Sequence, residues 1–247
     1  MERRQFLGFG GASVLAGVLG SCAGPVEELR YRLTVEVDTP EGLKTGSSVI
    51  EVRGQRNHDW VNPEGRGTRS SFKGEAVAVD LPGGKTLFAL LVGVEGGGSD
   101  AMNYPWLAFQ DRLKQSEDYL DDLRLMRRWR GEIAPMPLTR SLQKRGVGLG
   151  IQNPVACNPK LVTFSDLADP KTVIEVTPQT IGAVFGSGVN LKRITIEITD
   201  DSITKRLSKR LPWLNDYFNK TFAGNRFAIS RSLPDSLSAG AFTTERL

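Results

Sequence analysis

The sequence predicts an α+β fold, mainly an antiparallel sheet built from hairpins with two helical segments, in a single compact domain. Alternating apolar residues mark strands, two Asp-x-Pro-x-Gly turns join strands in pairs, and two stretches show helical spacing. The chain has 247 residues, of which 39% are hydrophobic and 24% are charged. This length and composition suit a globular core rather than a disordered chain.

Strict alternation predicts the first strand. Leu33, Val35 and Val37 fall on one face, and polar residues lie between them. Residues 38–42 contain the Pro and Gly of a tight turn, and residues 48–53 form the expected return strand. These segments predict an antiparallel hairpin.

A second hairpin is predicted further along the chain. Residues 72–79 and 86–94 have strand patterns and flank the turn sequence at 80–84. Because both hairpins follow one plan, we expect their four strands to belong to a single antiparallel sheet.

The first helical segment is expected over 105–130. Its apolar residues follow helical spacing, and its acidic residues precede its arginines, the order that complements the helix dipole. The Pro- and Gly-rich residues 131–160 predict an irregular connection. Strands are expected again at 160–164, 172–176 and 193–199.

The second helical segment is expected to carry Ile203, Leu207 and Leu211, with an N-cap at one of the polar residues 200–202. The Ser-, Gly- and Thr-rich residues 223–247 predict a loosely structured tail. The globular domain is therefore expected to span 30–222.

Residues 1–21 have the anatomy of a secretory signal peptide, with a basic start, an uncharged middle and small residues before a boundary. As a helix, the apolar stretch 6–19 would span about 21 Å at about 1.5 Å per residue. That is short for a hydrocarbon core about 30 Å thick. A removable signal is therefore favoured over a permanent span.

The start of this segment resembles the twin-arginine export motif, in which paired arginines precede one residue and then Phe and Leu. The matching residues are Arg3, Arg4, Phe6 and Leu7. Glu2 and Gly8 depart from the usual residues at their positions, so the general secretory route stays open.

The sequence Leu-Gly-Ser-Cys at 19–22 resembles a lipobox, the site where lipoprotein signal peptidase cuts before the cysteine. The resemblance implies two or three acyl chains on Cys22, enough for stable membrane anchoring. Ala23 in place of Asp favours the outer membrane. We therefore expect an envelope lipoprotein that faces the periplasm, with residues 22–29 as a tether. An uncleaved anchor and an ordinary secreted protein are the alternatives.

Four stretches of the mature part resemble a family of uncharacterised proteobacterial proteins. They read YRLTVEVDTPEGLKTGSSVIEV, GEAVAVDLPGGKTLFALL, LVTFSDLADPKTV and LKRITIEITDDSITKRLSKRLPWL, and cover much of residues 30–215. The resemblance brings no known activity, cofactor or catalytic residue.

The residues favour no catalytic, metal or cofactor site. His58 is the single histidine, and no Gly-x-Ser-x-Gly elbow accompanies it. A zinc site needs three or four ligands, and one histidine with Cys157 does not supply them. With Cys22 acylated, Cys157 also lacks a disulfide partner. The aspartate pairs 166/169 and 200/201 suit turns and helix caps. The net charge, +4 for the chain and +3 without residues 1–21, is too small to indicate nucleic-acid binding.

One loop is the candidate binding surface, because it interleaves cations with aromatic residues. Such a surface can hold an anionic sugar, a lipid headgroup or an acidic protein. We therefore expect a partner-binding domain for an envelope protein or a cell-wall component. An envelope hydrolase that uses His58 or a carboxylate pair stays open as the alternative. The residues of the surface are Arg56, His58, Trp60, Arg66 and Arg69.

Overall fold

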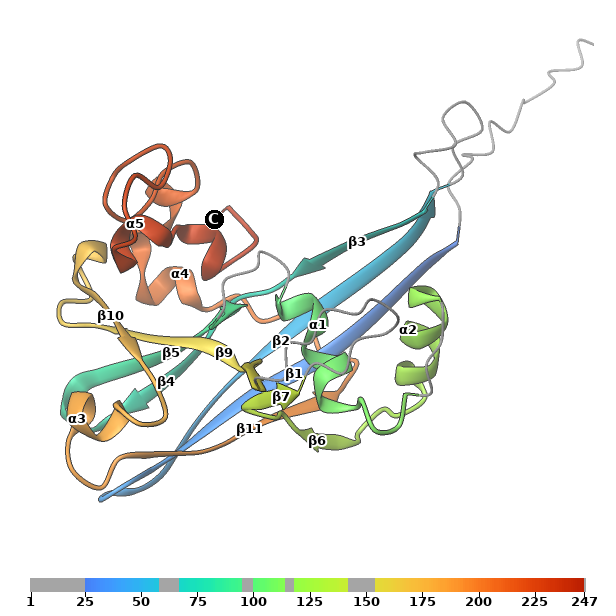
Figure 1. The fold of residues 1–247 in the computed structure, drawn as a ribbon, viewed down its shortest axis with the longest axis horizontal. Helices are drawn as coiled ribbons and strands as arrows, with labels where there is room; N and C mark the ends of the chain where they lie inside the picture. The colour runs from blue at the N-terminus through green and yellow to red at the C-terminus, as the bar shows by residue number, and fades with distance from the viewer. Residues whose placement is uncertain (1–24, 58–66, 95–99, 114–117, 142–153, 247) are drawn as a thin grey trace, which may run out of the picture.

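Two larger antiparallel sheets, a small two-stranded sheet and several short helices form the part of the chain that the computed structural model describes (Figure 1). The described residues are 25–57, 67–94, 100–113, 118–141 and 154–246. The predicted fold class, α+β with antiparallel sheets built from hairpins, is confirmed.

The first sheet has five strands in the order β3-β2-β1-β11-β6. Its centre is the predicted first hairpin, closed where Thr39 pairs with Gly42. Gly42 has φ of +106°, a conformation that suits glycine. The strands are β1 (Val26–Thr39), β2 (Gly42–Asn57), β3 (Gly67–Lys73), β6 (Ile133–Pro135) and β11 (Asn190–Ile198).

The second sheet has four strands in the order β10-β9-β5-β4 and contains the second predicted hairpin. The 3₁₀ turn η2 (Pro82–Gly84) joins β4 to β5 there. The expectation that both hairpins share one sheet was therefore wrong. The strands are β4 (Val77–Leu81), β5 (Lys85–Gly93), β9 (Pro159–Phe164) and β10 (Val173–Val176).

The predicted strand 72–79 is divided between the two sheets. Between β3 and β4, the N–H groups of Gly74 and Ala76 donate to the C-terminal end of the chain rather than to the backbone of β2. The Ala76 N–H donates to the Phe242 carbonyl at 2.7 Å, and the Gly74 N–H donates to the Thr244 hydroxyl at 3.0 Å. These bonds let the chain pass from one sheet to the other without losing backbone hydrogen bonds.

Apolar residues fill both faces of the second sheet. Leu87 and Leu91 of β5 belong to the core that the two sheets share with the helices, whereas Phe88 and Leu90 belong to a second core under the C-terminal segment. Successive strand residues point to opposite faces, so β5 lies between two apolar layers.

Two short helices replace the single helix expected over 105–130. They are α1 (Asp100–Ala108) and α2 (Tyr119–Arg127). Asp118 has an extended backbone, and its carboxylate accepts from the Leu120 N–H at 2.9 Å, which makes it the N-cap of a new helix. A further short helix, α3 (Ile181–Phe185), precedes β11.

The helix expected to carry Ile203, Leu207 and Leu211 is only one turn long, α4 (Leu207–Arg210). Before it, the Thr204 hydroxyl accepts from the Val49 N–H at 2.8 Å, so this stretch bonds to β2. The Thr204 N–H also donates to the Val49 carbonyl at 3.2 Å, so the backbone here pairs with β2 instead of forming a helical turn.

Residues 131–160, where an irregular connection was expected, hold short strands. Strands β7 (Thr139–Ser141) and β8 (Pro154–Ala156) pair with each other, and η3 (Pro170–Thr172) leads into β10. Regular structure in this region is thus limited to short pieces.

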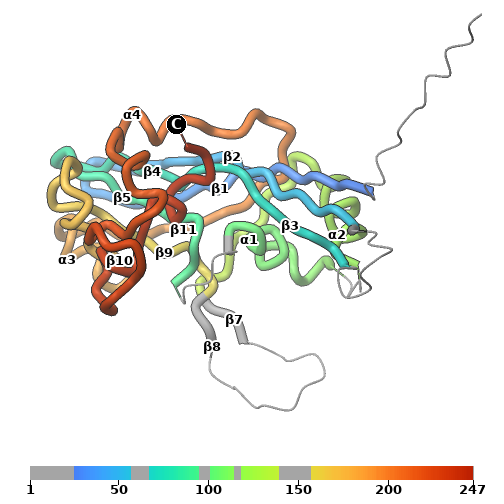
Figure 2. Tube along the Cα trace, turned by 90° about the horizontal axis from the view of Figure 1, so that it is seen from above, coloured from blue at the N-terminus to red at the C-terminus, as the bar shows by residue number. Residues whose placement is uncertain are grey.

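Both boundaries of the domain differ from those expected. Strand β1 begins at Val26, inside the expected tether 22–29. At the other end, part of the expected loose tail 223–247 is packed, because Leu237, Ala239, Ala241 and Phe242 are buried in the second core. This end contains η4 (Pro212–Tyr217), α5 (Leu233–Ser236) and η5 (Ala239–Ala241). Figures 1 and 2 place it beside β10, at the opposite end of the molecule from α2.

Candidate functional site

Most residues that the sequence analysis singled out lie outside the described part of the chain. Their predicted roles in lipidation, export and binding stay predictions. They are Cys22, Arg3, Arg4, Phe6, Leu7, His58, Trp60 and Arg66.

The two described members of the predicted binding surface, Arg56 and Arg69, lie on neighbouring strands. In the register of β2 and β3, Arg69 lies opposite Gln55, and Arg56 lies opposite Thr68. Because alternate side chains point to opposite faces of a sheet, the two arginines extend from opposite faces. The structure therefore does not bring these two cations together.

Arg56 has a structural partner. It forms an ion pair with Asp118, the N-cap of α2. The bond from the Leu120 N–H and the ion pair with Arg56 lower the pKa of the Asp118 carboxyl. Arg56 thus fastens the first turn of α2 to β2.

The carboxylate pairs considered in the sequence act in turns and ion pairs. Asp166 and Asp169 each accept a backbone N–H two residues ahead at 2.9 Å, as turn-forming aspartates do. Asp200 and Asp201 form ion pairs with different arginines. Cys157 is half-buried, with its sulfur 3.3 Å from a backbone carbonyl oxygen. Across the described ranges, no three His, Cys, Asp or Glu side chains are grouped as a metal site would require.

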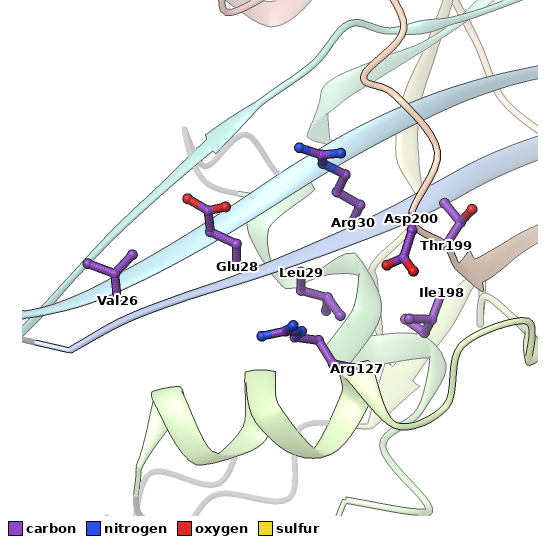
Figure 3. A pocket seen from close by; sticks show the side chains of 8 residues that line it. All are labelled: Val26, Glu28, Leu29, Arg30, Arg127, Ile198, Thr199 and Asp200. Carbon is purple, nitrogen blue, oxygen red and sulfur yellow. The ribbon is translucent and has the colours of Figure 1, made fainter.

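A groove of about 390 Å³ opens beside the start of β1, between α2 and the end of β11 (Figure 3). Its charged side chains are engaged in ion pairs. Arg127 lies 3.4 Å from Glu27, and Arg30 lies 2.7 Å from Glu51. Since these pairs join α2 and β2 to β1, the groove is better explained by the architecture than by a ligand.

A second groove, of about 790 Å³, lies in the C-terminal segment, and we call it the C-terminal groove. It is hollowed between residues 218–228 and the region around α5. Polar, cationic and aromatic side chains share its lining, including Lys220, Thr221, Arg226, Phe227, Asp235 and Ser236.

An aromatic cluster fixes the chain beneath this groove. The fully buried Phe222 ring lies 5.2 Å from Trp213 and 5.6 Å from Phe242, measured between ring centroids. Phe164 of β9 belongs to the same cluster, 5.6 Å from Trp213. The two pairs with Trp213 are edge-to-face, and such pairs attract one another beyond the area that they bury. The cluster therefore attaches the groove firmly to the second sheet.

The buried Asp235 carboxylate organises the loop beside the groove. One oxygen accepts from the Asn225 amide at 3.0 Å and from the Thr221 hydroxyl at 3.2 Å, and the other accepts from the Ile229 and Ser230 N–H groups. These bonds, led by that from Asn225, lower the pKa of Asp235 to about 2. Asp235 is therefore ionised at neutral pH and ties both ends of the loop 225–230 to α5.

The rim of the groove exposes apolar and cationic side chains together. Phe227 is 72% exposed and Ile229 is 79% exposed. The Arg226 guanidinium lies 5.4 Å from the centre of the Phe227 ring, and the Lys220 ammonium lies 4.6 Å from that of Tyr217. This rim can bind a ligand that carries both anionic and apolar groups.

Comparisons with protein-family models, curated proteins and solved structures gave no match. Among the described residues, no helix is both long and apolar enough to cross a membrane. The resemblances noted in the sequence thus stay predictions.

The sequence analysis missed the C-terminal groove because the composition of 223–247 indicated loose packing. A local signal was present in the run Arg-Phe-Ala-Ile-Ser-Arg at 226–231, where two apolar residues alternate between two arginines. The capping role of Asp235 depends on residues up to fourteen positions away, and no local pattern announces it.

Proposed function

We propose that this chain is an envelope lipoprotein whose domain binds a component of the cell envelope. Residues 1–21 direct its export, and lipid on Cys22 holds it to a membrane, with the outer membrane favoured and the domain facing the periplasm. Its binding surface is the C-terminal groove. An envelope protein and a cell-wall component are the partner classes predicted from the sequence.

The observation that carries the proposal is how soon the fold begins after Cys22. Only residues 23–25 separate Cys22 from Val26, the first residue of β1. The Pro25 carbonyl already accepts from the Arg56 N–H at 3.1 Å. At about 3.5 Å per extended residue, the start of β1 lies within about 14 Å of the acylated cysteine.

Such a short connection limits how the domain can move on the membrane. A long polar linker would let the domain reach far from the bilayer, whereas three residues keep the adjoining ends of β1 and β2 beside it. A folded domain that begins three residues after an acylated cysteine would therefore be held close to the bilayer.

The C-terminal groove supports the binding part of the proposal. It combines exposed apolar side chains with cations. The exposed side chains Phe227 and Ile229 at its rim are not part of the hydrophobic core. Exposed apolar groups rimmed by polar residues mark interaction surfaces.

The test of anchoring is metabolic labelling with an alkyne analogue of palmitate in cells that produce the full chain. We expect label on the native chain and on the Cys157→Ser variant, and none on the Cys22→Ser variant. The Cys157→Ser variant is the matched control because it removes the other cysteine. Equal labelling of the Cys22→Ser variant would refute the proposal.

A further inference from the structure

We propose that the occupant of the C-terminal groove's rim is an anionic phospholipid surface. Phe227 and Ile229 enter the bilayer interface, while Arg226 and Arg231 bind phosphate headgroups. This inference rests on the proposed function, since Cys22 brings the domain to a bilayer, and it names the partner of the same site.

The apolar tip of the loop is the first observation. Two large apolar side chains, 72% and 79% exposed, project from a run of six residues. Single exposed apolar residues are ordinary on protein surfaces, but two on one short loop form a small apolar patch. Moving such apolar surface from water into an apolar phase lowers the free energy of the system.

The loop is held in shape before any contact is made. Asp235 accepts the N–H groups of Ile229 and Ser230, and the Thr221 N–H donates to the Asn225 carbonyl at 2.7 Å. Because the backbone beside Phe227 is already ordered, little conformational entropy remains to be lost on binding.

The charges around the tip favour an anionic partner. Arg226 and Arg231 border the apolar residues, and Lys220 and Arg246 lie on the same segment. Of the carboxylates in this segment, Asp235 is buried among donors, Glu245 pairs with Lys205 at 2.7 Å, and Asp216 is exposed in η4. The loop 225–232 itself contains no acidic residue, so its own charge is positive.

The order of these residues favours lipid over a protein partner. Arginines on both sides of an apolar pair can extend their guanidinium groups to headgroup phosphates while the apolar side chains sit deeper. A protein partner would need a recess for two protruding side chains, whereas a bilayer interface accepts them without a matching shape.

The C-terminal segment lies where it could touch the same membrane that holds Cys22. Figure 1 places the C-terminal segment and the first residues of β1 toward the upper side of the molecule. The turn between β1 and β2 lies on the lower side. A flat surface near the start of β1 can therefore also meet the C-terminal segment, and the β1–β2 turn stays in water.

The test reads the loop directly in the full, acylated chain reconstituted into vesicles. In a Cys157→Ser background, Ala228→Cys carries an environment-sensitive fluorophore, and Glu41→Cys in the β1–β2 turn is the matched control position. The vesicles are phosphatidylcholine alone, or phosphatidylcholine with roughly one third phosphatidylglycerol as the anionic lipid.

We expect the emission at position 228 to shift to the blue in the anionic vesicles, and the emission at position 41 to stay that of water. At about a fivefold loss per arginine, a variant with Arg226→Gln and Arg231→Gln should lose about 25-fold in the ratio of inserted to free loop. Phe227→Ser with Ile229→Ser should abolish the shift. The four residues replaced in these variants are exposed, so we expect the variants to fold. An unchanged circular dichroism spectrum verifies this.

A label at 228 that stays in water in both kinds of vesicle overturns the inference. A blue shift that appears only after another envelope protein is added also overturns it, in favour of a protein partner. Mass spectrometry of Cys22 in the same sample reads the anchor separately, so failure of the loop is distinguished from failure of the proposed function.

Discussion

At the scale of the residue, single polar groups decide the local shape of this protein. The Asp235 carboxylate accepts hydrogen bonds from four donors, those of Thr221, Asn225, Ile229 and Ser230. Without it, these donors would lose their partner and the loop 225–230 would lose its attachment to α5. Asp118 performs a similar task at the start of α2. Hydrogen bonds to the ionised form lower the pKa of both carboxyls, led by the Asn225 side chain at Asp235 and by the Leu120 N–H at Asp118.

The first prediction concerns acid stability. Because the pKa of Asp235 falls from an ordinary 3.8 to about 2 in the folded protein, its ionised form stabilises the fold. That contribution is complete above about pH 4 and is lost as the pH falls toward about 2. Thermal unfolding followed between these values should show it.

The variant Asp235→Asn removes this dependence, because its amide would place a donor against the donors of Asn225 and the loop. We expect a lower melting temperature at neutral pH and a flatter decline in acid. Asp216→Asn, an exposed aspartate of the same segment, is the control. A wild-type acid profile in the Asp235→Asn variant would contradict the assignment.

At the scale of the element, alternation predicted the strands well but did not predict how they divide into sheets. The turns at 38–42 and 80–84 fall where the sequence places them, because Pro and Gly act locally. The run Leu-Phe-Ala-Leu-Leu at 87–91 held a further signal. A continuous apolar strand is buried on both faces, as β5 is.

What the sequence could not predict depends on distant partners. The single helix expected over 105–130 is two helices because α2 has its own N-cap. Strand 72–79 divides because the end of the chain supplies bonds to 74–76. Of the predicted site, the described residues Arg56 and Arg69 are on opposite faces, a fact that follows only from the strand register.

The second prediction tests the close approach of the two sheets. A Cβ added at Gly46 of β2 would lie 2.2 Å from the Ala78 carbonyl oxygen of β4. Backbone atoms cannot yield as a flexible side chain can, so Gly46→Ala should lower the free energy of unfolding by about 2 kcal/mol. Urea denaturation measures this.

Gly67→Ala is the matched control, because an added Cβ at Gly67 meets nothing within 4 Å. We expect that variant to unfold like the native protein. Equal stability of the Gly46 and Gly67 variants would mean that β2 and β4 are not in close contact.

At the scale of the whole molecule, the second sheet is stable only because both of its faces are covered. The first sheet and the helices cover one face, and the C-terminal segment covers the other. Phe242 joins three rings of the second core, those of Phe88, Phe164 and Phe222. The last residues are therefore part of the domain, and the groove they form stands on a fixed base.

The third prediction follows from this layering. Phe242→Ala opens a cavity in the second core and should lower the free energy of unfolding by about 3–5 kcal/mol. Phe227→Ala, which truncates an exposed ring of the same segment, should change it by less than about 0.5 kcal/mol. Urea unfolding of both variants separates the two cases, and similar losses for both would contradict the layered core.

The central claim is that acyl chains on Cys22 hold this domain beside a membrane. Mass spectrometry of the N-terminal peptide, taken from protein purified out of native membranes, tests it most directly. We predict a peptide that begins at Cys22 and carries the mass of two or three acyl chains. A peptide that still begins at Met1, with an unmodified cysteine at position 22, would contradict the claim.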